Sequence, residues 1–76
     1  MYEKIKNLLI EELSINEDSI GMDTALVKDL EMNSLELAEF VLTCEEHFGI
    51  VIKDEDLKKL TTVGDIVSYV EKSLNG

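Results

Sequence analysis

The sequence predicts a small all-α protein, a four-helix bundle of three main amphipathic helices and one short helix. Three segments repeat apolar residues at the spacing of one helix face, and polar stretches with capping residues or glycine separate them. A chain of 76 residues is expected to form one domain, residues 1–76. A core of this size supplies roughly 3–5 kcal/mol of stability and leaves no room for a deep catalytic cleft.

The first helix is expected over residues 2–13, because apolar residues recur there on one face. The residues at positions i, i+3, i+7 and i+11 of this face are Tyr2, Ile5, Leu9 and Leu13. The pattern dissolves in residues 14–33, where scattered apolar residues stand among acids, Asn, Ser and Gly. This long loop joins the first and second helices, and loops of such length without structure of their own tend to be functional.

The second helix is expected from Ser34 to about Phe48, with Gly49 ending it. Asn33 is the N-cap and Glu36 occupies the third position, which is a capping box with Asn in place of Ser or Thr. The apolar residues of its buried face are Leu37, Phe40, Val41, Cys44 and Phe48. A separate flank mixes apolar and acidic side chains at the spacing i, i+4, i+7 and i+11, namely Leu35, Glu39, Leu42 and Glu46.

Two further helices are expected after an extended connector at residues 50–52. Asp54 can cap a brief third helix over residues 55–60. Thr62 as N-cap and Asp65 at the third position begin the fourth helix, which stops at residues 75–76. The apolar residues on one face of this helix are Val63, Ile66, Val67, Val70 and Leu74.

The charge balance excludes nucleic acid as a partner. Seven lysines, no arginine and seventeen acids give a formal net charge of −10. Between Lys28 and Lys53 there is no lysine or arginine, so the negative field is centred on the second helix. Because a nucleic-acid backbone requires clustered Lys or Arg, we expect protein partners with basic patches instead. The plain alternative is a solvated acidic face that keeps a small protein in solution.

Membrane, metal and catalytic roles have little support. No apolar run approaches the roughly 20 residues of a membrane span, and the first residues lack the apolar stretch of a signal peptide, so we expect a cytoplasmic protein. We also expect it to be a monomer. A single cysteine excludes an internal disulfide, and a single histidine leaves no zinc ligand set. We expect Cys44 in the core and His47 on the surface. Because no nucleophile is paired with a general base, the protein is expected to be non-catalytic.

Ser34 is the candidate functional residue. A serine near a helix start is usually a cap, but here Asn33 takes that role and leaves the Ser34 hydroxyl free in the first turn. The first turn of a helix carries unpaired N–H groups and partial positive charge. A phosphate ester on Ser34 is therefore stabilised where it stands, and we interpret this serine as an attachment point.

Residues 30–37, Leu-Glu-Met-Asn-Ser-Leu-Glu-Leu, resemble the serine-bearing motif of acyl carrier proteins, in which Asp-Ser-Leu opens the second of four helices. Residues 45–50, 54–57 and 60–65 are similar to the third helix of that family and its approach to the fourth. The resemblance spans nearly the whole chain. It implies a stand-alone type II carrier in which a phosphopantetheinyl transferase attaches 4′-phosphopantetheine from coenzyme A to Ser34.

The same resemblance implies that the arm holds acyl groups as thioesters for acyl-processing enzymes of type II fatty acid biosynthesis. The residues it assigns to partner recognition are Leu35, Glu36, Glu39, Leu42 and Glu46. The residues it assigns to an acyl pocket between helices are Leu26, Leu42, Ile52, Leu57, Leu60 and Ile66. Ordinary core packing is the alternative for this second group, and the two roles are compatible.

Three residues depart from the usual pattern of that family. Asn33 replaces an Asp, Glu31 stands where Gly is usual, and Lys53 stands where Pro is common. Asn33 still caps the helix but lacks a charge that the family's transferase commonly contacts. A dedicated carrier for a polyketide, an amino acid or another acyl group is therefore an alternative. An alternative of another class is an acidic helical interaction protein that uses Ser34 only as a cap.

Overall fold

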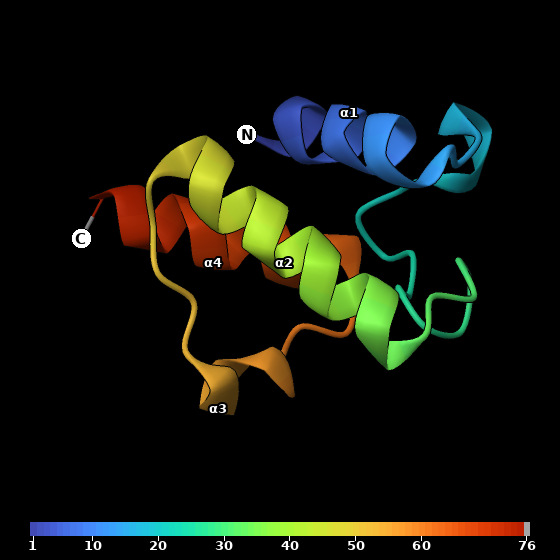
Figure 1. Ribbon diagram of the computed structural model, residues 1–76. Coiled ribbons are helices and arrows are strands. Elements are labelled where there is room, and N and C mark those ends of the chain that lie inside the picture. The colour runs from blue at the N-terminus through green and yellow to red at the C-terminus, as the bar shows by residue number, and fades with distance from the viewer. Residues whose placement is uncertain (76) are drawn as a thin grey trace.

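The computed structural model describes residues 1–75, and it confirms an all-α bundle with three main helices and one short helix. Along the chain come α1 (Tyr2–Leu13), a single 3₁₀ turn η1 (Glu17–Ser19), α2 (Ser34–Phe48), α3 (Asp54–Leu57) and α4 (Val63–Asn75). Figure 1 shows α1, α2 and α4 grouped together, with α3 at the edge of this group. In the described part of the chain, no helix is long and apolar enough to span a membrane.

The core lies between α1, α2 and α4, as their apolar periodicity predicts. Its buried side chains are Ile5, Leu8, Leu9, Leu26, Met32, Phe40, Val41, Cys44, Ile52, Leu60, Val63, Ile66, Val67 and Val70. Leu37 and Phe48, expected on the buried face of α2, are only partly buried against this core. Leu74 is 49 % exposed, because the last turn of α4 extends beyond the core. The buried residues outside the three long helices belong to the loop and to the flanks of α3.

The ends of α1 and α2 are confirmed, and local chemistry explains both. α1 stops at Ser14, whose φ of 54° turns the backbone into the left-handed region. α2 stops at Gly49 with φ of 66°, and the N–H of Gly49 donates to the carbonyl of Glu45. Glycine adopts this conformation without the steric cost that a Cβ imposes, so it is a favourable stop signal.

The loop between α1 and α2 is more ordered than expected. Besides η1, residues 22–26 pair with residues 61–64 through an isolated antiparallel bridge between Ala25 and Thr62. The backbone bonds of this pairing run from Leu26 N–H to Thr61 O (2.9 Å), from Val63 N–H to Thr24 O (3.0 Å) and from Gly64 N–H to Met22 O (2.8 Å). The pairing fixes the loop to the start of α4.

The expected limits of α3 were wrong, while the start of α4 was correct. Lys53, not Asp54, is the N-cap of α3, and the helix ends at Leu57. Beyond it, the N–H of Leu60 bonds to the carbonyl of Leu57, an i to i+3 bond that tightens the chain into a turn. α4 includes Asn75, and Gly76 lies outside the described residues.

Candidate functional site

Ser34 is the first residue of α2, and its side chain is exposed. The predicted capping box is present. The N–H of Glu36 donates to Asn33 Oδ1 at 2.8 Å, and the N–H of Asn33 donates to Glu36 Oε1 at 3.1 Å. These two bonds cap the helix without the Ser34 hydroxyl, which makes no hydrogen bond within residues 1–75. The hydroxyl is therefore free to carry a substituent.

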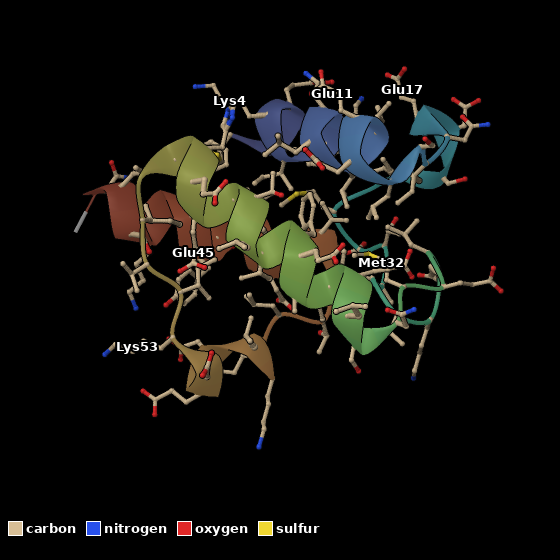
Figure 2. All side chains as sticks on the ribbon, in the orientation of Figure 1. Lys4, Glu11, Glu17, Met32, Glu45 and Lys53 are labelled. Carbon is tan, nitrogen blue, oxygen red and sulfur yellow. The ribbon has the colours of Figure 1, made fainter. Side chains whose placement is uncertain are left out.

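The backbone before Ser34 is held by a buried side chain and a left-handed residue. Met32 is only 3 % exposed, and its N–H donates to the carbonyl of Leu26 at 3.2 Å. Figure 2 shows Met32 beside the first turn of α2. Glu31 has φ of 55°, a conformation that favours glycine. This explains physically why the family pattern places Gly at this position.

A surface groove begins at Ser34. Its part nearest Ser34 measures about 250 Å³ and is lined by Ser34, Leu37, Ala38, Leu57 and Lys58. A second part of about 530 Å³ shares three of these residues, and its full lining is Ala25, Val27, Lys28, Leu37, Leu57, Lys58, Leu60 and Thr61. We call the two parts together the Ser34 groove. It runs between the first half of α2, the loop and α3.

The Ser34 groove contains two of the six residues assigned to an acyl pocket, Leu57 and Leu60. Three others are buried deeper in the core, namely Leu26, Ile52 and Ile66. Leu42 does not belong with them, because its side chain is 54 % exposed on the surface of α2. Leu42 therefore lies outside the groove, on the exposed flank of α2.

The exposed flank of α2 has the predicted mixture of apolar and acidic residues. Leu35 is 68 % exposed, and Glu39 and Glu46 are exposed as well. Glu36 differs from them, because it is half-buried and its carboxylate accepts the capping bond from Asn33. Its charge is thus tied to the helix start rather than fully free for a partner.

The residues around Ser34 suit a phosphodiester. The helix start supplies backbone N–H groups and partial positive charge, which attract anions. Lys58 is exposed and lines both parts of the Ser34 groove, so a basic residue borders the groove. The apolar side chains of Leu37 and Leu57 continue the groove away from it. This arrangement fits a group with an anionic end at Ser34 and a longer apolar extension.

The two other candidate side chains, Cys44 and His47, lie in the core and on the surface respectively. Cys44 is fully buried. This burial, and to a smaller extent the negative charge of Glu45, raises the pKa of the Cys44 thiol to about 12. The thiol therefore stays protonated at neutral pH. His47 is exposed and contacts Phe48 edge to face, with ring centroids 4.8 Å apart. Within residues 1–75, no three His, Cys, Asp or Glu side chains are grouped to hold a metal ion.

Comparison with known proteins agrees with this geometry. The profile of the family described as "Phosphopantetheine attachment site" matches residues 3–70. The chain is 40 % identical over 74 residues to an acyl carrier protein of Thermotoga maritima, covering 97 % of this chain and 91 % of that protein. The chain belongs to the acyl carrier protein family. An acyl carrier protein of Petrotoga mobilis is 36 % identical over 75 residues, covering 99 % of this chain and 88 % of that one.

Comparison with solved structures finds the same fold in an acyl carrier protein. The crystal structure of an acyl carrier protein from Thermotoga maritima superposes with a TM-score of 0.83, covering 96 % of this chain and 85 % of that one. At 23 % sequence identity, this match supports the fold alone. The family assignment gives 4′-phosphopantetheine as the prosthetic group and the carriage of acyl groups as the role.

Sequence reasoning missed several residues near Ser34. Lys58 lines the groove although it is distant from Ser34 in the chain, and the loop residues Val27 and Lys28 line the second part of the groove. Leu37 was assigned to the core but also lines the groove. Apolar periodicity identifies the face of a helix, but it does not reveal which loop will lie beside that face.

Proposed function

We propose that Ser34 carries the 4′-phosphopantetheine arm of this acyl carrier protein. Two observations support Ser34: its hydroxyl is exposed and unbonded, and Asn33 and Glu36 complete the helix cap without it. The arm supplies a thiol that carries acyl groups as thioesters. The chain itself places the attachment oxygen at a helix start, where backbone N–H groups carry partial positive charge, and Lys58 lines the adjoining groove.

We propose type II fatty acid biosynthesis as the pathway and the cytoplasm as the location. The two curated relatives, both named acyl carrier protein, support a general carrier of this kind. The proposed partners are a phosphopantetheinyl transferase and acyl-processing enzymes with basic docking patches, with the chain acting as a non-catalytic monomer. A dedicated carrier for a specialised acyl group is the second candidate, because Asn33 replaces the usual acid beside the serine.

We propose the exposed flank of α2 as the docking surface. Glu39 and Glu46 supply negative charge for steering, and Leu35 and Leu42 supply small apolar contacts. Steering by exposed charges acts mainly on the association rate and weakens with salt. Such a surface suits partners that bind briefly and in turn.

We propose that the Ser34 groove shelters the acyl chain. Leu57 and Leu60 line it directly, and outward movement of α3 would give access to the deeper Leu26, Ile52 and Ile66. The groove opens next to the attachment oxygen, so an arm that bends back along the protein surface brings the acyl group at its thiol end to the groove. Burial of each methylene there contributes about 0.8 kcal/mol.

Mass spectrometry of the intact protein tests the attachment. Incubation with coenzyme A and a broad-specificity phosphopantetheinyl transferase should add one phosphopantetheinyl group to the wild type and none to Ser34→Ala. Ser68→Ala is the matched control, because Ser68 is an exposed serine within α4 and its variant should be modified normally. An unmodified wild type, or modification of Ser34→Ala, would contradict the proposal.

A further inference from the structure

α3 separates the Ser34 groove from a second hollow. Leu57 and Lys58 line the groove, whereas Asp56 and Lys59 line the second hollow, which measures about 700 Å³. The two share no lining residue. Neighbouring side chains of α3 and of the turn after it thus line different hollows, so the position of this short helix sets the width of the groove. The question is what holds it in place.

One bond ties α3 to α4. The hydroxyl of Tyr69 donates to Asp56 Oδ2 at 2.8 Å, and Tyr69 is partly buried against the core. The bond to Asp56 is the main reason that the pKa of Tyr69 is raised above its ordinary value, at which the phenol is already protonated and able to donate at neutral pH. Hydrogen bonds to a charged acceptor are stronger than those between neutral groups.

A second bond ties the connector before α3 to α2. The N–H of Ile52 donates to Glu45 Oε2 at 2.9 Å, and the side chain of Ile52 is buried. Figure 2 shows Glu45 on α2 and Lys53 at the start of α3, on either side of this connector. The bond therefore restrains the N-terminal end of α3, while the bond from Tyr69 restrains the side of α3 that faces the second hollow.

Little else within α3 itself resists movement. The helix has four residues, of which Asp54 and Glu55 are exposed and Asp56 and Leu57 are partly buried. A helix of this length has no stability of its own. Its place depends on Leu57, which packs partly buried against the core, on the buried side chains of Ile52 and Leu60 at its flanks, and on the bonds from Tyr69 and Ile52.

We propose that Tyr69 and Glu45 are specificity-determining residues, which clamp α3 and thereby set the length of acyl chain that the Ser34 groove accommodates. This inference rests on the proposed function, because it takes the occupant to be a chain tethered to Ser34. A longer chain must displace α3 outward, and displacement breaks both bonds. The free energy of the bonds is then the cost of widening the groove.

Hydrogen exchange in the unloaded protein tests the clamp without any prosthetic group. The amides to follow are those of Asp56, Lys59 and Leu60, whose bonds form the turns of α3. In Tyr69→Phe, their exchange should become roughly tenfold faster, which corresponds to about 1.4 kcal/mol. Tyr2→Phe is the matched control, because the Tyr2 hydroxyl donates to the carbonyl of Ile20 at 3.2 Å, far from α3 in the chain. Equal exchange rates in the two variants would overturn the clamp.

Loading of Ser34 with acyl-phosphopantetheine of increasing chain length tests the effect on cargo. The wild type should gain thermal stability with each added carbon until the groove is filled, and then lose that gain. In Tyr69→Phe the maximum should move to longer chains, while Tyr2→Phe should follow the wild type. Normal loading with an unchanged maximum in Tyr69→Phe overturns the inference alone. Failure to load the wild-type Ser34 overturns the proposed function and this inference together.

Discussion

Asn33 and Glu36 cap each other at the start of α2: the side chain of each accepts a hydrogen bond from the backbone N–H of the other, at 2.8 and 3.1 Å. This reciprocal pair leaves the hydroxyl of Ser34 unused. It also gives Glu36 two possible effects on the protein, because the carboxylate both completes the cap and adds negative charge to α2. The two roles can be separated by substitution.

Glu36→Gln should keep the cap, because an amide oxygen accepts the same bond, whereas Glu36→Ala should lose it. We expect Glu36→Ala to lower the free energy of unfolding by about 0.5–1 kcal/mol and Glu36→Gln to leave it within about 0.3 kcal/mol of the wild type. Urea denaturation measures both. Glu39→Gln is the charge-matched control, since Glu39 is exposed and its carboxylate accepts no capping bond. Equal destabilisation by Glu36→Gln and Glu36→Ala would contradict a capping role.

Glu31→Gly should stabilise the protein. A non-glycine residue with φ of 55° carries a steric cost of about 1–2 kcal/mol, and the extra freedom of glycine in the unfolded chain offsets part of it. The expected net gain is about 0.5–1 kcal/mol, measured by urea or thermal unfolding. Glu31→Gln controls for the loss of a negative charge. If Glu31→Gln stabilises as much as Glu31→Gly, charge rather than backbone strain is responsible.

Gly64→Ala should loosen the loop that leads to Ser34. A Cβ at Gly64 would lie 2.9 Å from the carbonyl oxygen of Met22, which accepts the Gly64 N–H at 2.8 Å. Because backbone must move to relieve this clash, we expect a loss of about 1–3 kcal/mol of stability. Gly21→Ala is the matched control, since its Cβ would meet only Thr24 Oγ1 at 3.5 Å, an ordinary contact. Similar unfolding free energies for the two variants would show that the close approach is unimportant.

Asp65 should contribute stability that disappears in acid. Hydrogen bonds from the hydroxyl and N–H of Thr61, and then from Thr62, lower the pKa of Asp65 below its usual 3.8. A carboxyl with a lower pKa in the folded state stabilises the protein above the unfolded pKa and loses this effect as the pH falls through the folded value. Stability measured against pH should therefore decline less below about pH 4 in Asp65→Asn than in the wild type. Parallel pH profiles would exclude this contribution.

The limits of α1 and α2 could be predicted from the sequence, because periodicity and the caps at Asn33 and Gly49 are local signals. The exposure of the Ser34 hydroxyl followed from the same capping argument.

The pairing of Ala25 with Thr62 could not be predicted, since backbone bonds between distant segments leave no pattern in the sequence of either segment. Lys58 was not assigned to the groove that begins at Ser34, because the sequence does not show how distant segments pack against each other. Leu42 was assigned to both the surface and the pocket, although its helical position already favoured the surface.

Cys44 should be unreactive in the native protein, which allows the arm to be counted through its own thiol. Burial raises the pKa of Cys44 to about 12, so almost no thiolate forms near neutral pH, and the side chain has no exposed surface for a reagent. Titration with a disulfide reagent under native conditions should detect no thiol in the unmodified protein and one per chain after modification of Ser34. Denaturation should add Cys44 to both counts.

Two variants remove this second signal. Cys44→Ala leaves a cavity in the core, at a cost of about 1–3 kcal/mol of stability, and Cys44→Val fills the site better. Rapid native labelling of Cys44 would contradict its buried position.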